Sequence, residues 1–203
     1  MIYKYDPYQL IAGTDEAGRG SLAGPVVAAS VILPKGRYYK KLNDSKLLKA
    51  DLRESLYKEI TATAISWKIV FKSHQVIDSI NILNASHEAM YQAALSLEPR
   101  PEILLVDGNS FKKDSRIPYE CKVNGDAIYA PIAAASILAK VARDRFMAEL
   151  SRIKKYSVYD WSHNKGYATP AHIEAIKIYG FSDLHRKSFI VKSLQLSLFD
   201  RKQ

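Results

Sequence analysis

The chain has 203 residues, 47% of them hydrophobic, and its 30 lysines and arginines exceed its 21 aspartates and glutamates to give a net charge of +9. This length can bury a full core, and no repeat or low-complexity linker divides it, so we expect one domain over 1–190 with a tail at 191–203. The lone Cys121 excludes an intrachain disulfide, and the longest apolar run, at 26–33, is too short to span a bilayer. The start of the chain lacks a signal-peptide pattern, so we expect a cytoplasmic protein without a membrane segment. We also expect a monomer.

Hydrophobic periodicity predicts strands and amphipathic helices along the chain. Strands are expected at residues 9–15, 26–33, 64–71 and 102–107. Helices are expected at residues 48–60, 82–97 and 131–150, the last of them alanine-rich and buried on most sides, and after Thr169 and Pro170. This order of elements is typical of an α/β fold in which a mixed sheet is flanked by helices and followed by a helical C-terminal part.

Acidic residues stand where two predicted strands end, beside glycines. The first strand runs into the hexad 15–20, which reads DEAGRG, and the fourth ends at Asp107, directly before a glycine. Asp126 follows an Asn-Gly turn signal. If the two strands are neighbours in one sheet, Asp15 and Asp107 emerge at neighbouring positions, and Glu16 and Asp126 can close a ring of carboxylates.

Such a ring can hold two cations about 3.5–4 Å apart, the arrangement that supports in-line displacement at phosphorus. The glycines of the hexad would let a phosphate or a sugar approach the main chain. An aspartate before a glycine is also a common turn signal, so each acid taken alone is compatible with a purely structural role. The recurrence of strand, acid and glycine at two places favours the metal site.

Several blocks of the sequence resemble bacterial ribonuclease HII, a type 2 ribonuclease H. They follow the family's order and cover the chain from about residue 10 to about residue 190. The blocks are the hexad with Ala23, Gly24 and Pro25, the triplet Asp44-Ser45-Lys46, and the segments 105–109, 132–144 and 163–167.

The resemblance implies a ribonuclease-H-like fold and an endonuclease that hydrolyses the RNA strand of RNA/DNA hybrids. It also implies a nick 5′ of a single ribonucleotide embedded in duplex DNA, leaving a 3′-hydroxyl and a 5′-phosphate, and a role in ribonucleotide removal during DNA replication and repair. The implied cofactor is Mg²⁺ or Mn²⁺. The family's metal-binding acids fall on Asp15, Glu16, Asp107 and Asp126, its ribose-sensing triplet on Gly18, Arg19 and Gly20, and its junction-sensing tyrosine on Tyr167.

These transferred roles are chemically reasonable. The 2′-hydroxyl distinguishes RNA from DNA, and Gly18 and Gly20 let main-chain groups reach it without a Cβ in the way. Tyr167 offers a flat ring that can stack on the next sugar, although a half-buried structural tyrosine is the alternative. Lys46 can contact a phosphate, or it can simply be solvated. The net positive charge favours a polyanionic partner, but basic proteins of other classes share it.

Three histidines raise the question of a zinc site. His163, His172 and His185 have no cysteine partners and no close pair in the sequence, so we do not expect zinc. We expect His163 to order the loop that carries Tyr167, and His172 to make a structural hydrogen bond. Arg143, inside the alanine-rich helix, is also expected to be structural.

The tail contains a second resemblance. Its pentapeptide Gln195-Leu196-Ser197-Leu198-Phe199 is similar to the bacterial sliding-clamp-binding motif, in which a leucine and a phenylalanine fill an apolar pocket. The alternative is that Leu196, Leu198 and Phe199 pack on the protein's own surface. Short motifs recur by chance, so the sequence leaves both open.

Two other functions compete with the ribonuclease HII activity. A hybrid nuclease of the ribonuclease HIII type is disfavoured because that type lacks an equivalent of Arg19 and carries an additional N-terminal domain. A catalytically silent nucleic-acid-binding adaptor is disfavoured by the four acids, because clustered carboxylates near a polyanion are repulsive unless cations bridge them.

Overall fold

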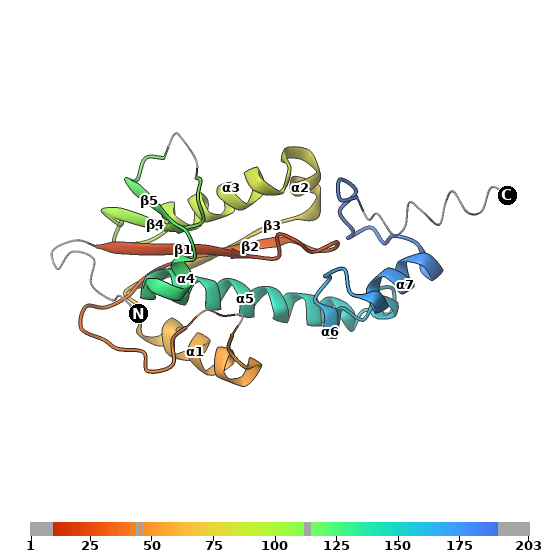
Figure 1. The fold of residues 1–203 in the computed structure, drawn as a ribbon, viewed down its shortest axis with the longest axis horizontal. Helices are drawn as coiled ribbons and strands as arrows, with labels where there is room; N and C mark the ends of the chain where they lie inside the picture. The colour runs from red at the N-terminus through yellow and green to blue at the C-terminus, as the bar shows by residue number, and fades with distance from the viewer. Residues whose placement is uncertain (1–9, 44, 46, 112–114, 191–203) are drawn as a thin grey trace.

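A five-stranded mixed sheet forms the centre of the computed structural model, which describes residues 10–43, 45, 47–111 and 115–190 (Figure 1). The strands lie in the order β3-β2-β1-β4-β5. Their bounds are β1 Ile11–Ala17, β2 Val26–Ile32, β3 Ser66–Lys72, β4 Ile103–Asp107 and β5 Tyr119–Lys122. Strands β1, β2 and β3 pair antiparallel, whereas β4 runs parallel to β1 and β5 runs parallel to β4.

Helices cover both faces of the sheet (Figure 1). One face packs against α1 (Ala50–Thr63) and the long α5 (Ala130–Ser151), and the other packs against α3 (Ile82–Leu95). The short helices α2 (His74–Ile80) and α4 (Gly125–Ile128) precede α3 and α5. Each face has its own apolar core, since side chains alternate between the two faces along β2.

The alanine-rich helix α5 lies very close to strand β1. A Cβ on Gly13 would lie 2.1 Å from the main-chain carbon of Pro131, so only glycine fits at this contact. Ala133, Ala134 and Ala135 are fully buried, as expected for a helix that is covered on most sides. This close approach brings the residues of α5 next to the acids of β1.

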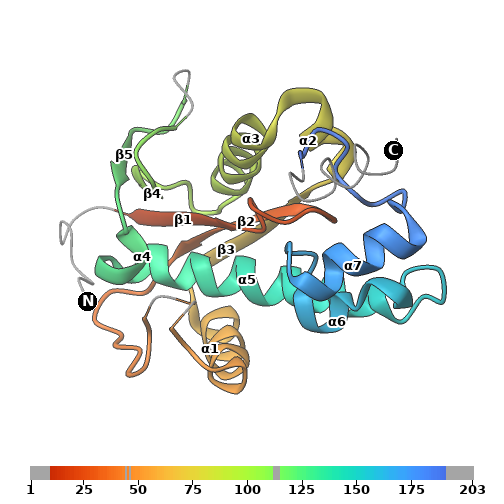
Figure 2. The same ribbon diagram turned by 45° about the vertical axis from the view of Figure 1, so that its right-hand side comes forward.

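The C-terminal part packs against the far end of α5 and against the β1–β2 connection (Figure 2). It comprises the short helices η1 (Ser157–Tyr159) and α6 (Trp161–Asn164), followed by α7 (Pro170–Tyr179). Thr169 caps α7 by accepting a hydrogen bond from the main-chain N–H of His172 at 3.3 Å, and Pro170 occupies the first turn, as predicted. Main-chain hydrogen bonds join Leu22 to Gly166 and Gly24 to Leu184, at 2.8 and 2.9 Å.

The predicted fold class is confirmed, and the four predicted strands and four predicted helices are all present with shifted ends. The sequence patterns missed β5, α2, α4, α6 and η1, all of which have seven residues or fewer. Within the described ranges, no helix combines the length and the apolarity needed to cross a bilayer.

Candidate functional site

The parallel pairing of β1 and β4 brings two of the predicted acids to neighbouring positions. Thr14 pairs with Val106 in the register, and the next residue on each strand is an aspartate, Asp15 on β1 and Asp107 on β4. Asp107 in turn accepts a hydrogen bond at 2.7 Å from the main-chain N–H of Gly125, the residue that precedes Asp126 at the start of α4. The register and this bond place segments with all four predicted acids in one region.

The carboxyl group of Asp15 has a strongly perturbed environment. Burial raises its pKa well above the ordinary value, and the nearby charges of Glu16 and Asp107 raise the pKa further, while a hydrogen bond with Ser136 lowers it. Asp15 is only 5% exposed. An ionised Asp15 is therefore unfavourable in this environment unless a cation compensates the clustered negative charge.

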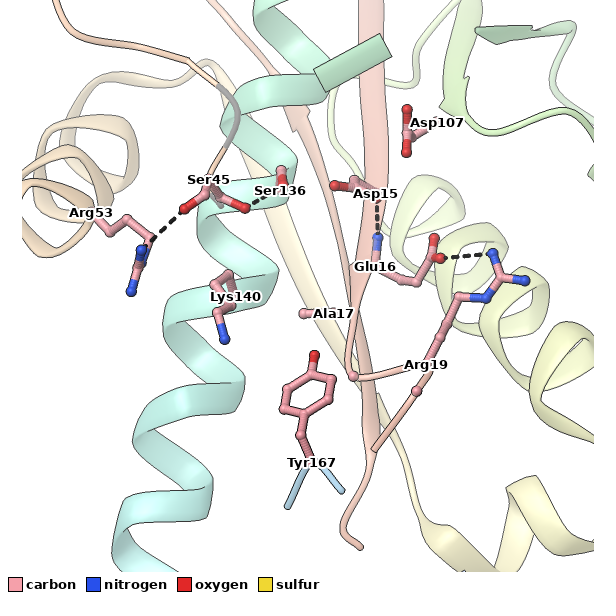
Figure 3. Close-up of a pocket in the computed structure, with 12 residues that line it drawn as sticks. Asp15, Glu16, Ala17, Arg19, Ser45, Arg53, Asp107, Ser136, Lys140 and Tyr167 are labelled. Carbon is pink, nitrogen blue, oxygen red and sulfur yellow. Dashed lines mark hydrogen bonds and ion pairs between the residues drawn. The ribbon is translucent and has the colours of Figure 1, made fainter. Parts of the chain in front are cut away.

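The acids interact with donors of the protein itself. Asp15 accepts a hydrogen bond from the main-chain N–H of Glu16 at 2.7 Å, and Glu16 pairs with Arg19 at 3.2 Å (Figure 3). Among the described residues, no three His, Cys, Asp or Glu side chains are already gathered closely enough to hold an ion. The residue types nevertheless fit Mg²⁺ or Mn²⁺, because carboxylate oxygens are the ligands these ions prefer and Asp15 needs a compensating charge.

A cavity of about 690 Å³ opens beside these acids. Its lining includes the whole hexad 15–20, Asp107 and Tyr167, so acids and predicted substrate-sensing residues share one space (Figure 3). Asp126 lies at the start of α4, is 4% exposed and does not line this cavity. The cavity is wide enough for a polar ligand to reach Asp15 and the triplet at the same time.

The triplet Gly18-Arg19-Gly20 forms the turn after β1. Gly18 has a φ of +95°, and a Cβ at this position would lie 2.0 Å from Nε of Arg143. Gly20 differs, because a Cβ there would meet no atom within 4 Å. The side chain of Arg19 is about half exposed. Gly18 is thus required by the fold itself, whereas Gly20 leaves open space beside the main chain.

Tyr167 reaches the cavity from the loop before α7, as predicted. It forms an isolated antiparallel bridge with Ser21, and its half-buried ring points into the cavity between α5 and β1 (Figure 3). The guanidinium of Arg143 lies 5.4 Å and the ammonium of Lys140 lies 5.7 Å from the centre of this ring. The tyrosine is therefore held at a position where its ring faces both the hexad and a basic side chain.

The prediction that His163 orders this loop is wrong. The ring of His163 is exposed and contacts Asp160 and Ser162 instead. The loop is ordered by Asn164, which accepts a hydrogen bond from the N–H of Gly166 at 2.8 Å, and by His172, whose Nδ1 lies 2.9 Å from the carbonyl oxygen of Tyr167. The structural hydrogen bond predicted for His172 is therefore present.

The tautomers of the buried pair His172 and His185 follow from their neighbours. The main-chain N–H of Ser182 must donate to Nδ1 of His185 (2.9 Å), and the indole N–H of Trp161 must donate to Nε2 of His172 (3.0 Å). His185 therefore carries its proton on Nε2, 3.1 Å from His172, and His172 donates through Nδ1 to Tyr167. A second proton on His185 would face the N–H of Ser182.

The buried histidine pair is expected to make the folded protein less stable in acid. Burial, followed by the neighbouring His172, lowers the pKa of His185 from its ordinary 6.5 to about 4. His185 in the unfolded chain therefore binds a proton at a higher pH than His185 in the folded chain. The contribution of neutral His185 to the free energy of unfolding is fully present above pH 6.5 and is lost progressively as the pH falls to 4. We expect the free energy of unfolding to be about 1–2 kcal/mol lower near pH 5 than near pH 7.5.

Urea denaturation at these two pH values measures the effect. The difference between the two free energies should shrink in His185→Gln, which lacks the titrating ring. An undiminished difference in that variant would remove His185 as the cause.

Comparison with known proteins identifies the family. The family model described as Ribonuclease HII matches residues 12–192. The chain belongs to the ribonuclease HII family. Ribonuclease HII of Cytophaga hutchinsonii is 48% identical to it over 189 residues, which cover 93% of each protein.

Solved structures agree with this assignment. The ribonuclease HII in the PCNA:RNase HII complex from Archaeoglobus fulgidus superposes with a TM-score of 0.76 at 27% identity, covering 90% of this chain and 96% of that one. Bst-RNase HIII, solved in complex with Mn²⁺, gives a TM-score of 0.72 at 18% identity, over 95% of this chain and 70% of that one, which shows a shared fold alone. Membership of the ribonuclease HII family makes this chain a ribonuclease H, a hydrolase of phosphodiester bonds.

The sequence predicted no role for three residues of this ribonuclease H cavity, Arg53, Ser136 and Lys140, whereas Ser45 belongs to the triplet that was expected to contact a phosphate. Ser136 and Lys140 line it from consecutive turns of α5, Ser45 lies next to Ser136, and Arg53 reaches it from α1 (Figure 3). The hydroxyls of Ser45 and Ser136 lie 2.8 Å apart, and Arg53 donates to the carbonyl of Ser45 at 3.1 Å. The spacing of Ser136 and Lys140 by four positions, inside a block that resembles the family, is the signal that could have revealed them.

Some predicted residues lie outside the described parts of the structure. They are Lys46 and the tail residues Gln195, Leu196, Leu198 and Phe199. Their roles in phosphate and clamp binding stay predictions.

Proposed function

We propose that the protein is a metal-dependent endonuclease that nicks duplex DNA on the 5′ side of a single embedded ribonucleotide and also cuts the RNA strand of RNA/DNA hybrids. The observation that carries the proposal is the β1–β4 register, which sets Asp15 beside Asp107 in a cavity that also contains the triplet 18–20 and Tyr167. A role in ribonucleotide removal in the cytoplasm is part of the same proposal.

Asp15, Glu16, Asp107 and Asp126 would hold Mg²⁺ or Mn²⁺. When bound, the ions would supply an activated water and stabilise charge on the leaving oxygen. The protein contributes the clustered carboxylates, and Arg19 pairs with one oxygen of Glu16. The crystal structure of Bst-RNase HIII in complex with Mn²⁺ supports this choice of ions.

The triplet and Tyr167 account for the choice of substrate in this proposal. Gly18 and Gly20 bring main-chain groups to the cavity wall, where they can hydrogen-bond the 2′-hydroxyl that distinguishes a ribonucleotide. The ring of Tyr167, held against the guanidinium of Arg143, is positioned to stack on the sugar that follows. Lys140 and Arg53 add positive charge where phosphates of the same strand can pass.

Arg19→Ala is expected to reduce the preference for a ribonucleotide junction about tenfold, with little change in affinity for all-DNA duplex. The side chain is half exposed at the cavity and pairs with the neighbouring Glu16, so the fold should tolerate its removal. The ratio of the cleavage rates on a single-ribonucleotide duplex and on a long RNA/DNA hybrid measures the preference, and the Kd values for the single-ribonucleotide duplex and the all-DNA duplex measure the affinities. Equal losses on RNA-containing and all-DNA ligands would contradict this role of Arg19.

A panel of three substrates tests the proposed activity. With Mg²⁺, the protein should nick a duplex carrying one ribonucleotide, cut a long RNA/DNA hybrid, and leave an all-DNA duplex intact. Cleavage of the hybrid alone would favour an activity of the ribonuclease HIII type. No cleavage of either RNA-containing substrate would favour the silent adaptor.

We also propose that the tail binds the bacterial sliding clamp through Gln195, Leu196, Leu198 and Phe199. The PCNA complex of the Archaeoglobus fulgidus relative supports a clamp partner in general. A pull-down with the bacterial clamp should retain the intact chain and lose the double variant Leu198→Ala with Phe199→Ala. Equal retention of both forms, or of neither, would contradict the proposal.

A further inference from the structure

Two arginines, one from α5 and one from the C-terminal segment, are buried side by side beneath the β1–β2 connection. Arg143 is 0% and Arg186 is 1% exposed. Both direct their donors to main-chain carbonyls. Arg143 donates to Pro25 at 2.9 Å, to Lys165 at 2.9 Å and to Ala23 at 3.2 Å; Arg186 donates to Gly18 at 2.7 Å, to Arg19 at 2.8 Å, to Gly24 at 3.0 Å and to Pro25 at 3.1 Å.

These bonds fix the two segments that carry the predicted substrate-sensing residues. Arg186 binds the carbonyls of Gly18 and Arg19, and Arg143 binds the carbonyl of Lys165, two residues before Tyr167. The ring of Tyr167 lies against the Arg143 guanidinium at 5.4 Å. The two arginines therefore set the distance between the triplet and the tyrosine.

Burying two guanidinium groups next to each other is unfavourable. Burial, followed by the charge of Arg143, lowers the pKa of Arg186 to about 9. A fork of planar donors can satisfy several carbonyls at once, which a lysine ammonium cannot do with the same geometry. The hydrogen bonds that fix the main chain of residues 18–25 offset this unfavourable electrostatic free energy. A requirement of substrate recognition for one conformation of these residues would explain the arrangement.

We propose that Arg186 is a positioning residue for ribonucleotide recognition, which holds the triplet in its substrate-reading conformation before substrate binds, with Arg143 as its partner. This inference rests on the proposed function. Arg186 acts through the main chain of Gly18 and Arg19, and its effect is on discrimination between RNA and DNA. A substrate that arrives at a preset triplet loses less free energy to ordering it.

Asp78 of α2 holds the segment that follows Arg186 in place. Its carboxylate accepts hydrogen bonds from the main-chain N–H groups of Lys187 at 3.0 Å and Ser188 at 2.9 Å, and from the Ser188 hydroxyl at 2.6 Å. These bonds fix the chain directly after Arg186. Loss of Asp78 should therefore loosen the triplet in the same direction as loss of Arg186, and less strongly.

Binding measurements with Ca²⁺ in place of Mg²⁺ test the proposal. The probes are a duplex with one ribonucleotide and an all-DNA duplex of the same sequence. The readout is the discrimination factor, which is the Kd of the all-DNA duplex divided by the Kd of the ribonucleotide duplex. The Tm of each variant is measured in parallel. Arg186→Lys should lower this factor about tenfold and leave the all-DNA Kd within about twofold, because the hydrogen bonds to the triplet are lost. Asp78→Ala should lower it about threefold. The matched control is Asp183→Ala, an acid of the same C-terminal part whose carboxylate binds Lys155 and Tyr156.

The outcomes distinguish failure of the positioning role of Arg186 from failure of the proposed function. A folded Arg186→Lys variant with an unchanged factor, or with equal losses on both duplexes, would overturn the positioning role. If that variant does not fold, Asp78→Ala decides, and a factor equal to that of Asp183→Ala overturns the proposal. Equal binding of both duplexes by the wild-type protein would instead refute the proposed function, and the positioning role with it.

Discussion

Asp107→Asn should lower kcat by about three orders of magnitude or more, since a bound ion stabilises the transition state by several kcal/mol and the amide is a poor ligand. Folding should be preserved. Asn has nearly the same volume, and its amide oxygen can still accept the hydrogen bond from Gly125 that Asp107 accepts at 2.7 Å. Removing this charge also relieves the repulsion that raises the pKa of Asp15, so the Tm without metal should be equal or higher.

Glu149→Gln is the matched control for this substitution. Glu149 is an exposed acid near the C-terminal end of α5 that pairs with Arg152 and does not line the cavity, so its loss of charge should leave kcat unchanged. Steady-state cleavage of a single-ribonucleotide duplex, with thermal denaturation of both variants, measures the contrast. Wild-type turnover in Asp107→Asn would exclude Asp107 from the site.

Gly18→Ala should destabilise the protein by about 2–4 kcal/mol and also impair ribonucleotide recognition. The new Cβ would sit in a left-handed conformation, at φ +95°, and 2.0 Å from Nε of Arg143. Arg143 would have to move, and its hydrogen bonds to Ala23, Pro25 and Lys165 would be lost. For a chain of this size the Tm should fall by about 5–15 °C.

Gly20→Ala provides the control within the same triplet. Its Cβ would meet no atom within 4 Å, so this variant should keep the wild-type Tm even if the added methyl obstructs substrate. Differential scanning calorimetry of the two variants gives the comparison. Equal thermal stability of Gly18→Ala and the wild type would show that the contact with Arg143 does not constrain the turn.

The sequence was sufficient to predict the strands that carry the acids, because β1 and β4 are buried apolar runs with a clear pattern. It did not predict β5, since only four half-buried residues form it, nor α4, a single turn after the Asn-Gly signal. Such short elements are defined by the partners they pack against, and local periodicity carries little information about them.

Some residues of the candidate site could likewise be predicted from the sequence, and others could not. The hexad and Asp107 were recognisable because acids and glycines interrupt apolar strands, and Tyr167 was recognisable through the resemblance. Arg186 was not, since its role depends on hydrogen bonds to residues more than 160 positions away in the chain. His163 was given the role that Asn164 and His172 perform, because the sequence does not show which of several polar neighbours faces the loop.

The most direct test of the central claim is to locate Mn²⁺ by anomalous scattering in crystals grown with an uncleavable substrate. The account predicts anomalous peaks within about 2.0–2.4 Å of carboxylate oxygens of Asp15 and Asp107, with Glu16 and Asp126 completing the ligand set. Peaks elsewhere, or an Asp15 and Asp107 pair that binds no ion beside the scissile phosphate, would contradict it.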